Sequence, residues 1–340
     1  MNTAEITELK ALLSEPKRIV VIGHKNPDGD AIGSTLGLST YLEKLGHNVR
    51  VMVPNDYPKF LKWMPGNEDI LKFETHSDNC GTLLKKAHLV FTLDFNALHR
   101  LGPEMEAVLD KLDCPFVMID HHQQPDDYAR FTYSDASMGS TSEMVYHFMK
   151  MMGHLQLLDA QIATNLYVGI MTDSGSFRFP ATTSTTHRVV ADLIDHGAQN
   201  SDIHRAVYDN NSENRMQLLG KALNNLRVLP EQRTAYISLS QQELDACDFK
   251  KGDTEGFVNY ALSIENVVLA AIFIESEKDE IIKISLRSKG DFSVNEVARE
   301  HFEGGGHINA AGGKSTRNMA DTITYFISIL PSYQNALLNA

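Results

Sequence analysis

The sequence predicts an α/β protein of two domains, the first built on a mainly parallel sheet and the second smaller, joined by a helical connector. Short apolar runs alternate with helical patterns in the first half, which is typical of right-handed crossovers and a parallel sheet. The middle of the chain is helical and polar, and strand patterns resume after it. The 340 residues also exceed the roughly 250 to 300 that one hydrophobic core usually serves.

The elements of the first domain follow from the spacing of apolar residues. An apolar run that ends in glycine, such as Ile19 to Gly23, indicates a buried strand, and apolar residues at helical spacing after the next polar loop indicate a helix. The predicted strands are 19–23, 48–53, 88–93 and 116–119, and the predicted helices are 31–45, 105–112, 142–152 and 159–171. We assign residues 1–195 to this domain.

The connector and the second domain are marked by a change of pattern. Helical, polar stretches at 186–196, 202–208 and 212–227 contain no core strand, and the connector is placed at 196–228. Strand patterns dominate again from Thr234. The second domain is predicted over 229–340, with strands at 266–274 and 281–286, a helix at 294–302 and a glycine-rich run at 304–307.

Composition and charge exclude several classes of protein. Hydrophobic residues at 42% and charged residues at 22% are ordinary for a soluble globular chain. The N-terminus lacks the apolar region of a signal peptide, and no run could span a bilayer, so we expect a cytoplasmic protein without a membrane partner. The three cysteines are too scattered for a disulfide framework. A net charge of -13 disfavours binding of long duplex nucleic acid, but a short phosphorylated ligand fits if bound cations supply positive charge.

The loop after the first strand concentrates residues that bind divalent cations. It contains His24, Asp28 and Asp30, and the neighbouring Pro27 and Gly29 favour a tight turn. An ordinary strand-to-helix turn capped by an aspartate explains this loop alone equally well. Other parts of the sequence are needed to decide between the two interpretations.

Further candidate ligands stand where apolar elements end. Asp94 and Asp120 each follow a predicted strand, Asp120 is followed by two histidines, and Asp173 ends an apolar helix. The carboxyl ends of parallel strands meet at one edge of a sheet, so these side chains are predicted to lie together. Two metals about 3.5 to 4 Å apart suit phosphoryl transfer, and mixed oxygen and imidazole ligands favour manganese over magnesium, with zinc, cobalt or iron as alternatives. The candidate ligands at this edge are His24, Asp28, Asp30, Asp94, Asp120, His121, His122 and Asp173, and four carboxylates with two histidines would suit such a pair.

Five segments in order resemble the signatures of the DHH/DHHA1 phosphoesterases, and within that family the overall length and the absence of extra domains most resemble the NrnA-like nanoRNase and pAp-phosphatase branch. The segments are 23–34, 94, 120–122, 172–175 and 304–307. The resemblance implies a DHH domain followed by a DHHA1 domain. It implies one metal held by His24, Asp28 and Asp94, and a second held by Asp30, Asp94, His121 and Asp173. Asp94 would bridge the metals, and His122 would orient the water or the scissile phosphate, which makes Asp94 and His122 the predicted catalytic residues.

The resemblance also places phosphate and base contacts in the second domain, across a cleft between the domains. Arg287 offers a bidentate donor, and glycines permit close approach of backbone to phosphate. The predicted substrate-binding residues are Arg287, Ser288, Gly304, Gly305, Gly306, His307 and, in the first domain, Asn26. For Asn26, Arg178 and the segment 139–141, an ordinary turn or cap role is an equal alternative.

The function expected from the resemblance is an exo-acting phosphodiesterase that releases mononucleotides from very short RNA, and a phosphatase acting on pAp. A cyclic-di-AMP or linear pApA phosphodiesterase is the nearest alternative, because it would use the same metals. A manganese inorganic pyrophosphatase, a processive single-strand DNA exonuclease and a non-catalytic nucleotide-binding protein fit the sequence less well. The expected partners are short RNA and small nucleotide phosphates, and homodimerisation is left open.

Overall fold

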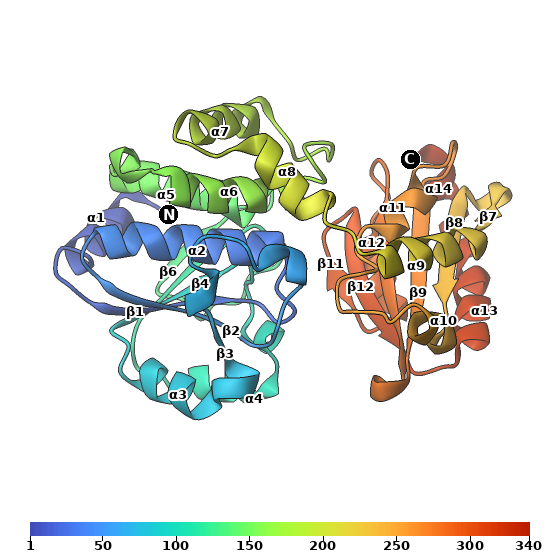
Figure 1. The fold of residues 1–340 in the computed structure, drawn as a ribbon, viewed down its shortest axis with the longest axis horizontal. Coiled ribbons are helices and arrows are strands. Elements are labelled where there is room, and N and C mark those ends of the chain that lie inside the picture. Colours follow the sequence, from blue (N-terminus) through green and yellow to red (C-terminus); the bar gives the residue numbers. More distant parts are fainter. The chain divides into compact units, whose positions relative to one another are not determined.

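The computed structural model describes residues 1–340 as two compact units, Met1–Asn210 and Asn211–Ala340 (Figure 1). The division falls inside the segment assigned to the helical connector. Each unit has its own sheet and its own hydrophobic core.

The first unit is built on a six-stranded sheet in the order β3-β2-β1-β4-β5-β6. All neighbouring strands are parallel, as the alternating sequence pattern predicts. The strands are β1 Arg18–Gly23, β2 Asn48–Val53, β3 Leu71–Lys72, β4 Leu89–Leu93, β5 Phe116–Asp120 and β6 Phe131–Ser134. After β3 the chain crosses back over β1 and β2 to place β4 on the other side of β1. The loops after β1 and β4 therefore leave the sheet in opposite directions, which is where open α/β sheets place their sites.

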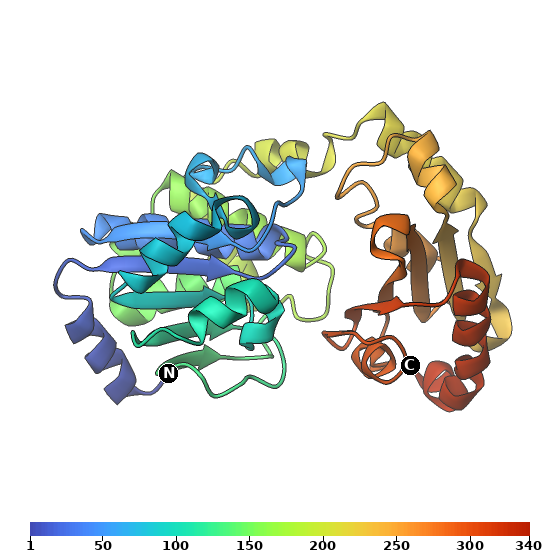
Figure 2. The ribbon, with the colours of Figure 1, turned by 90° about the horizontal axis from the view of Figure 1, so that it is seen from below.

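Helices cover both faces of this sheet (Figures 1 and 2), which explains why its central strands are continuously apolar. One face packs against the core that contains Val21 and Phe91, and the other against the core that contains Val20 and Val90. The helices are α1 Thr3–Leu12, α2 Gly29–Lys44, α5 Thr141–Met152 and α6 Ala160–Asp173 on the first face, and α3 Phe73–Lys85 and α4 Pro103–Leu109 on the second. α7 Ser184–Asp195 and α8 Asn200–Tyr208 pack against α6.

Glycines allow α2 and α6 to pack with their backbones in contact. A Cβ atom added to Gly33 in α2 would lie 2.5 Å from the carbonyl oxygen of Asn165 and 2.9 Å from the backbone nitrogen of Gly169, both in α6. A Cβ atom added to Gly169 would in turn overlap the side chains of Ser142 and Asp30. This close packing fixes the first turn of α2, which carries Asp30, against α5 and α6.

The second unit contains a mixed sheet in the order β11-β12-β10-β9-β8-β7. Its strands are antiparallel except for the parallel pair β8 and β9. The strands are β7 Arg227–Leu229, β8 Thr234–Leu239, β9 Leu269–Ser276, β10 Ile281–Ser288, β11 Gly305–Gly306 and β12 Ala310–Ser315. The helices are α9 Glu213–Asn224, α10 Gln241–Ala246 and α11 Phe257–Leu262 on one face, and α12 Val294–His301, α13 Met319–Ile329 and α14 Gln334–Asn339 on the other.

Three predicted boundaries in this region differ from the structure. The helix predicted over 212–227 ends at Asn224, because Arg227 pairs with Tyr236 in the sheet. The strand predicted from 266 begins at Leu269, because Asn266 adopts a left-handed turn conformation with φ 63°. The strand predicted over 281–286 continues to Ser288. No helix in the structure is both long enough and apolar enough to cross a membrane.

Candidate metal centre

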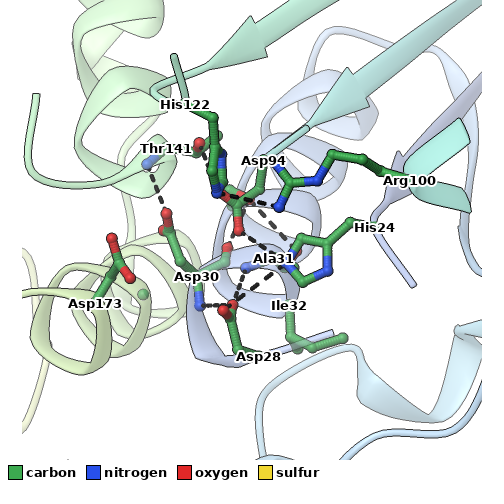
Figure 3. A network of polar contacts seen from close by, with 12 residues as sticks. His24, Asp28, Asp30, Ala31, Ile32, Asp94, Arg100, His122, Thr141 and Asp173 are labelled. Carbon is green, nitrogen blue, oxygen red and sulfur yellow. Dashed lines mark hydrogen bonds and ion pairs between the residues drawn. The ribbon is translucent and has the colours of Figure 1, made fainter. Parts of the chain in front are cut away.

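The loop between β1 and α2 brings His24 and Asp28 together. Asp28 caps α2, since its Oδ1 accepts hydrogen bonds from the backbone N–H groups of Asp30 and Ala31, both at 3.0 Å. Its second oxygen, Oδ2, lies 3.8 Å from Nε2 of His24. The capping interpretation and the ligand interpretation are therefore compatible, because each uses a different oxygen of the same carboxylate (Figure 3).

Asp94 follows β4 and lies between the two predicted groups of ligands. Its carboxylate is only 2% exposed, with Oδ2 at 3.3 Å from Nε2 of His24 and Oδ1 at 3.4 Å from Nε2 of His121. Thr141 donates a hydrogen bond from Oγ1 to Asp94 Oδ1 at 3.0 Å. The backbone of Asp94 has φ 65°, in the left-handed region that aspartate and asparagine tolerate better than most residues. A single buried carboxylate thus faces both histidines.

Asp30 is held by the N-terminus of α5. Its oxygens accept hydrogen bonds from the backbone N–H groups of Thr141 at 2.6 Å and Ser142 at 2.8 Å. These N–H groups lie in the first turn of the helix, where anions are favoured, and Ser140 caps that turn through Glu143. The segment 139–141, for which the sequence allows an ordinary cap role, thus caps α5 and supports a predicted ligand.

His121 lies among three carboxylates. Its Nε2 is 3.4 Å from Asp94 Oδ1, 3.4 Å from Asp173 Oδ2 and 3.8 Å from Asp30 Oδ2. Asp173 ends α6 and is partly exposed. The structure therefore brings together all six residues that were predicted to be metal ligands.

Both histidines have their ring orientation fixed by a backbone carbonyl. Nδ1 of His24 is 2.9 Å from the carbonyl oxygen of Lys25, and Nδ1 of His121 is 3.1 Å from that of Met138. A carbonyl only accepts, so Nδ1 of each ring carries a proton, and Nε2 is the nitrogen that faces the carboxylates. Histidine ligands of metals are commonly oriented by such a bond.

The charges of the cluster shift the protonation of its members. Burial lowers the pKa of His24, but the hydrogen bond to Asp94 and the charges of Asp28 and Asp94 outweigh it and raise the pKa to about 9. Burial also lowers the pKa of His121, but the hydrogen bond to Asp94 and the charges of Asp173, Asp94 and Asp30 together outweigh it and hold the pKa well above its ordinary value. Burial favours the neutral form of Asp94, yet hydrogen bonds from His121 and His24 hold its pKa well below its usual range. Burial and the charges of Asp94 and Asp173 raise the pKa of Asp30.

The donor set fits divalent cations. Ligand atoms of His24, Asp28 and Asp94 lie within 4.8 Å of one another, as do those of Asp30, Asp94 and His121. Carboxylate oxygens and imidazole nitrogens in this mixture suit manganese, iron or zinc. Another group of close ligand atoms comes from Asp94, Asp120 and His122, but two of its members are hydrogen-bonded to each other. Asp120 there already accepts two hydrogen bonds from His122, one from the backbone N–H at 2.9 Å and one from Nδ1 at 2.7 Å.

His122 is linked on its other side to a residue that the sequence did not single out. Nη2 of Arg100 is 3.3 Å from Nε2 of His122 (Figure 3). Burial lowers the pKa of His122, the charge of Arg100 lowers it further, and the hydrogen bond to Asp120 opposes both. His122 is therefore a neutral ring that donates Nδ1–H to Asp120 and accepts from Arg100 at Nε2. Arg100 lies in the 3-10 helix Leu98–Leu101, six residues beyond Asp94, and nothing in its sequence context marks it.

The predicted substrate-binding residues of the second unit lie at the end of its sheet. Arg287 is half-buried on β10 opposite Ala310, and its Nη1 donates to the carbonyl oxygen of Leu286 at 2.9 Å. Ser288 is buried; its hydroxyl donates to the carbonyl oxygen of Phe292 at 2.6 Å and accepts from Asn309 Nδ2 at 2.9 Å. Ser288 therefore fixes the adjoining loop.

The glycine run forms one side of a tight hairpin with β12. A side chain on Gly304 would overlap the carbonyl of Gly312, and one on Gly306 would overlap the backbone of Ala310. Two backbone N–H groups of the run are used internally: Gly304 donates to the Ala298 carbonyl at 3.1 Å and Gly306 donates to Asn295 Oδ1 at 2.9 Å. The hairpin thus accounts for Gly304 and Gly306 without a phosphate. Gly305 lies between them in β11 and pairs with Gly312.

His307 and Asn26 also have local roles. The backbone N–H of His307 donates to the Ala310 carbonyl at 2.7 Å, so its imidazole, and not its amide, remains the predicted substrate contact. Asn26 has φ 56° and forms reciprocal bonds with Asn55, at 2.7 Å and 2.9 Å. Asn26 therefore acts first as a turn residue that joins the loop between β1 and α2 to the loop after β2.

Comparisons with known proteins place the chain in a family. The model of the DHH family, N-terminal domain, matches residues 18–170, and that of the DHHA1 domain matches residues 240–330. A curated relative from Streptococcus mutans, the probable bifunctional oligoribonuclease and PAP phosphatase NrnA, is 30% identical over 314 residues, covering 91% of this chain and 94% of the relative. The chain belongs to the DHH/DHHA1 phosphoesterase family. Its DHH motif is Asp120, His121 and His122.

Further comparisons agree in fold, and two of the three proteins also agree with this chain in length. The bifunctional oligoribonuclease and PAP phosphatase NrnA of Thermus thermophilus is 29% identical over 310 residues, covering 86% of this chain and 83% of that protein. The crystal structure of an exopolyphosphatase-related protein from Bacteroides fragilis superimposes with a TM-score of 0.94 at 39% identity, covering 99% of this chain and 98% of that one. RecJ from Thermus thermophilus, at 15% identity and a TM-score of 0.53, shares the fold over 99% of this chain and 55% of its own.

Proposed function

We propose that this protein is a metal-dependent phosphodiesterase that hydrolyses very short RNA from one end to mononucleotides and also removes phosphate from pAp. The observation that carries the proposal is the presence of two clusters of carboxylate and imidazole ligands, one with His24 and one with His121, that share Asp94. The choice of substrates rests on the relatives that cover most of this chain, which are named for oligoribonuclease and PAP phosphatase activity.

Two divalent cations, with manganese preferred, complete the proposed site and supply Lewis-acid catalysis of phosphoryl transfer. His24, Asp28 and Asp94 would hold one, and Asp30, Asp94, His121 and Asp173 the other. The residues of the chain prepare these positions in advance. The carbonyls of Lys25 and Met138 direct Nε2 of each histidine toward the carboxylates, and the N-terminus of α5 fixes Asp30.

Substrate binding is proposed for Arg287 and His307, with Ser288, Gly304, Gly305 and Gly306 shaping the loop around them. Arg287 is suited to a phosphate group because its guanidinium can donate two parallel hydrogen bonds. The imidazole of His307 offers a donor or a stacking surface for a base. Asn26 is proposed to act through the conformation of the metal-binding loop.

Turnover of a matched substrate panel by the manganese-loaded protein tests the proposal. The panel comprises RNA dinucleotides to pentanucleotides, a longer RNA, pAp, cyclic di-AMP, linear pApA and pyrophosphate. We expect the highest kcat/KM on the shortest RNA and measurable release of phosphate from pAp. Faster turnover of cyclic di-AMP or pyrophosphate would contradict the substrate assignment and leave the metal site intact.

One relative makes cyclic di-AMP the specific competitor in this panel. The cyclic-di-AMP phosphodiesterase GdpP of Geobacillus thermodenitrificans is 26% identical over 318 residues, which cover 90% of this chain but only 46% of that protein. Its greater divergence and length favour the short-RNA assignment. The ratio of kcat/KM for linear pApA to that for cyclic di-AMP separates the two activities directly.

Binding of manganese is expected to release protons at neutral pH. Because the pKa of His24 is raised from 6.5 to about 9, the metal-free ring is protonated at neutral pH, whereas a ligand must be neutral. Apparent metal affinity should therefore rise with pH until about pH 9. The stability of the metal-free protein changes with pH in the opposite direction. The charged pair of His24 and Asp94 stabilises the fold fully below pH 6.5, and this stabilisation is lost as the pH rises through 9.

Calorimetric titration of manganese in buffers with different ionisation enthalpies measures this release. We expect roughly one to two protons per protein near neutral pH, from His24 and His121. His24→Gln should reduce the number, and His99→Gln, which changes an exposed histidine outside the cluster, should leave it unchanged. Metal binding without proton release would contradict this prediction, because the two histidines would then either be neutral already or not bind the metal.

A further inference from the structure

We propose that Arg100 contacts a non-bridging oxygen of the scissile phosphate, and that His122 is a positioning residue that acts through Arg100 and not on the substrate itself. The proposal deepens the phosphoesterase function proposed above and rests on it. It assigns a substrate contact to a residue between the DHH signatures and changes the role predicted for His122.

The geometry of His122 supports this role. Its Nδ1 is 2.7 Å from Oδ1 of Asp120, which is fully buried, and its backbone N–H donates to the other oxygen of the same carboxylate. Its Nε2 is 3.3 Å from Nη2 of Arg100. Both ring nitrogens thus have assigned partners. Because Asp120 fixes the ring, the ring in turn fixes the position of the guanidinium. Figure 3 shows the guanidinium of Arg100 pointing toward the His122 ring, on the side of the cluster where His24 and Asp94 lie.

The backbone around Arg100 is tied to the same loops. The carbonyl oxygen of Arg100 accepts the backbone N–H of Lys25 at 3.1 Å, which joins it to the loop that carries His24 and Asp28. Asn96, which is buried, donates from Nδ2 to the carbonyl oxygens of His122 at 3.1 Å and Gln123 at 2.9 Å. The loop after β4 is therefore fastened to the loops after both neighbouring strands, and Arg100 is fixed at both its backbone and its side chain.

Charge explains why a cation would be placed here. Five aspartates line the centre: Asp28, Asp30, Asp94, Asp120 and Asp173. Two divalent cations would leave one negative charge over, which opposes the approach of a phosphodiester anion. Arg100 supplies the missing positive charge, and its guanidinium bonds to the ring of His122 and to no carboxylate of the cluster. Its remaining N–H groups are thereby left to an anion that the site binds.

The chemical step needs no proton from Arg100, whose guanidinium stays charged. Water supplies the oxygen that bonds to phosphorus, the bond from phosphorus to the leaving oxygen breaks, and the protons of that water end on the leaving oxygen and on the product phosphate or solvent. Arg100 stabilises the charge on the non-bridging oxygen during this exchange. Loss of one such preorganised donor commonly costs about 100- to 1,000-fold in kcat.

The experiment compares Arg100→Ala, His122→Gln and the double variant with wild type and with His99→Ala, an exposed neighbour used as the control. We expect each single variant to lower kcat by about 100-fold, with unchanged manganese affinity, and the double variant to lose no more than either. Guanidinium ion should restore part of the activity to Arg100→Ala and none to His122→Gln. Losses that multiply in the double variant would overturn the proposal.

Aryl phosphodiesters distinguish the proposed role of His122 from proton donation. If His122 only positions Arg100, His122→Gln should slow p-nitrophenyl and phenyl esters by the same factor. If His122 protonates the leaving oxygen, the phenyl ester should suffer much more, since its leaving group is the stronger base, and this result would refute the positioning role.

A binding measurement separates this proposal from the proposed function. Calorimetry of inorganic phosphate with the manganese-loaded protein should show about 10-fold weaker binding by Arg100→Ala than by wild type. If wild type hydrolyses no phosphate ester but this difference is found, the function fails and the Arg100 contact stands. If wild type is active and Arg100→Ala retains both activity and phosphate affinity, the contact fails and the function stands.

Discussion

Asp94→Asn is expected to lower kcat by roughly 1,000-fold or more, because the change removes the one charge that both predicted metal positions share. The carboxylate lies 3.3 Å from His24 and 3.4 Å from His121. Asparagine keeps the shape of the side chain and tolerates the left-handed backbone found there, at φ 65°. The loss should therefore come from the site and not from unfolding.

Two measurements give this result its meaning. Manganese stoichiometry by calorimetry should fall below that of wild type, while circular dichroism and the melting transition should show a folded protein. The control is Asp127→Asn, which removes the same charge from an exposed position in the loop after the DHH motif and should leave turnover unchanged. Near-normal activity of Asp94→Asn would refute a mechanism in which two cations share this carboxylate.

Gly33→Ala is expected to destabilise the first unit by about 3 kcal/mol, at the upper end of the range for overpacking of a core. The new Cβ would lie 2.5 Å from the carbonyl oxygen of Asn165 and 2.9 Å from the nitrogen of Gly169. Both atoms belong to the backbone of α6, so no side chain can rotate away to make room. The two helices must move apart, and Asp30 in the first turn of α2 must move with them.

Chemical denaturation followed by circular dichroism measures the change in the unfolding free energy of the first unit. The matched control is Gly81→Ala in α3, where an added Cβ would meet no atom within 4 Å. That variant should be unchanged or more stable by about 0.5 to 1 kcal/mol, the helix propensity difference. Equal stability of the two variants would show that α2 and α6 do not pack through their backbones.

Prediction from the sequence worked best for elements whose local apolar pattern agrees with their place in the tertiary structure. β1, β4 and β5 are buried on both faces, so their apolar runs are unbroken and their ends are easily located. Each of these ends is followed by a candidate ligand, and parallel strands bring such ends together. The fold class and the proximity of the ligands that follow these three strands result from those two facts, whereas Asp173 ends the helix α6.

Features that depend on distant contacts could not be predicted in this way. β12 contains alanine, glycine, lysine and serine but no β-branched residue, and it forms a strand through its pairing with β10 and β11. α3 is largely polar and buries only Phe73, Cys80 and Leu84. The roles of Ser142 and Arg100 depend on Asp30 and His122, partners distant in sequence, and neither residue type marks a site by itself.

The hairpin around Gly304 and Gly306 bears on how related genes will diverge. Both glycines are required by contacts with the facing backbone, so folding alone selects for them whether or not a substrate is bound. The clustered aspartates of the first unit differ in this respect. Their like charges repel one another, so without bound cations they destabilise the fold. In a duplicated gene that keeps the fold but loses the chemistry, the aspartates should drift first and the glycine signature should persist. That signature by itself therefore marks ancestry, and a homologue should be assigned activity from its aspartates and histidines.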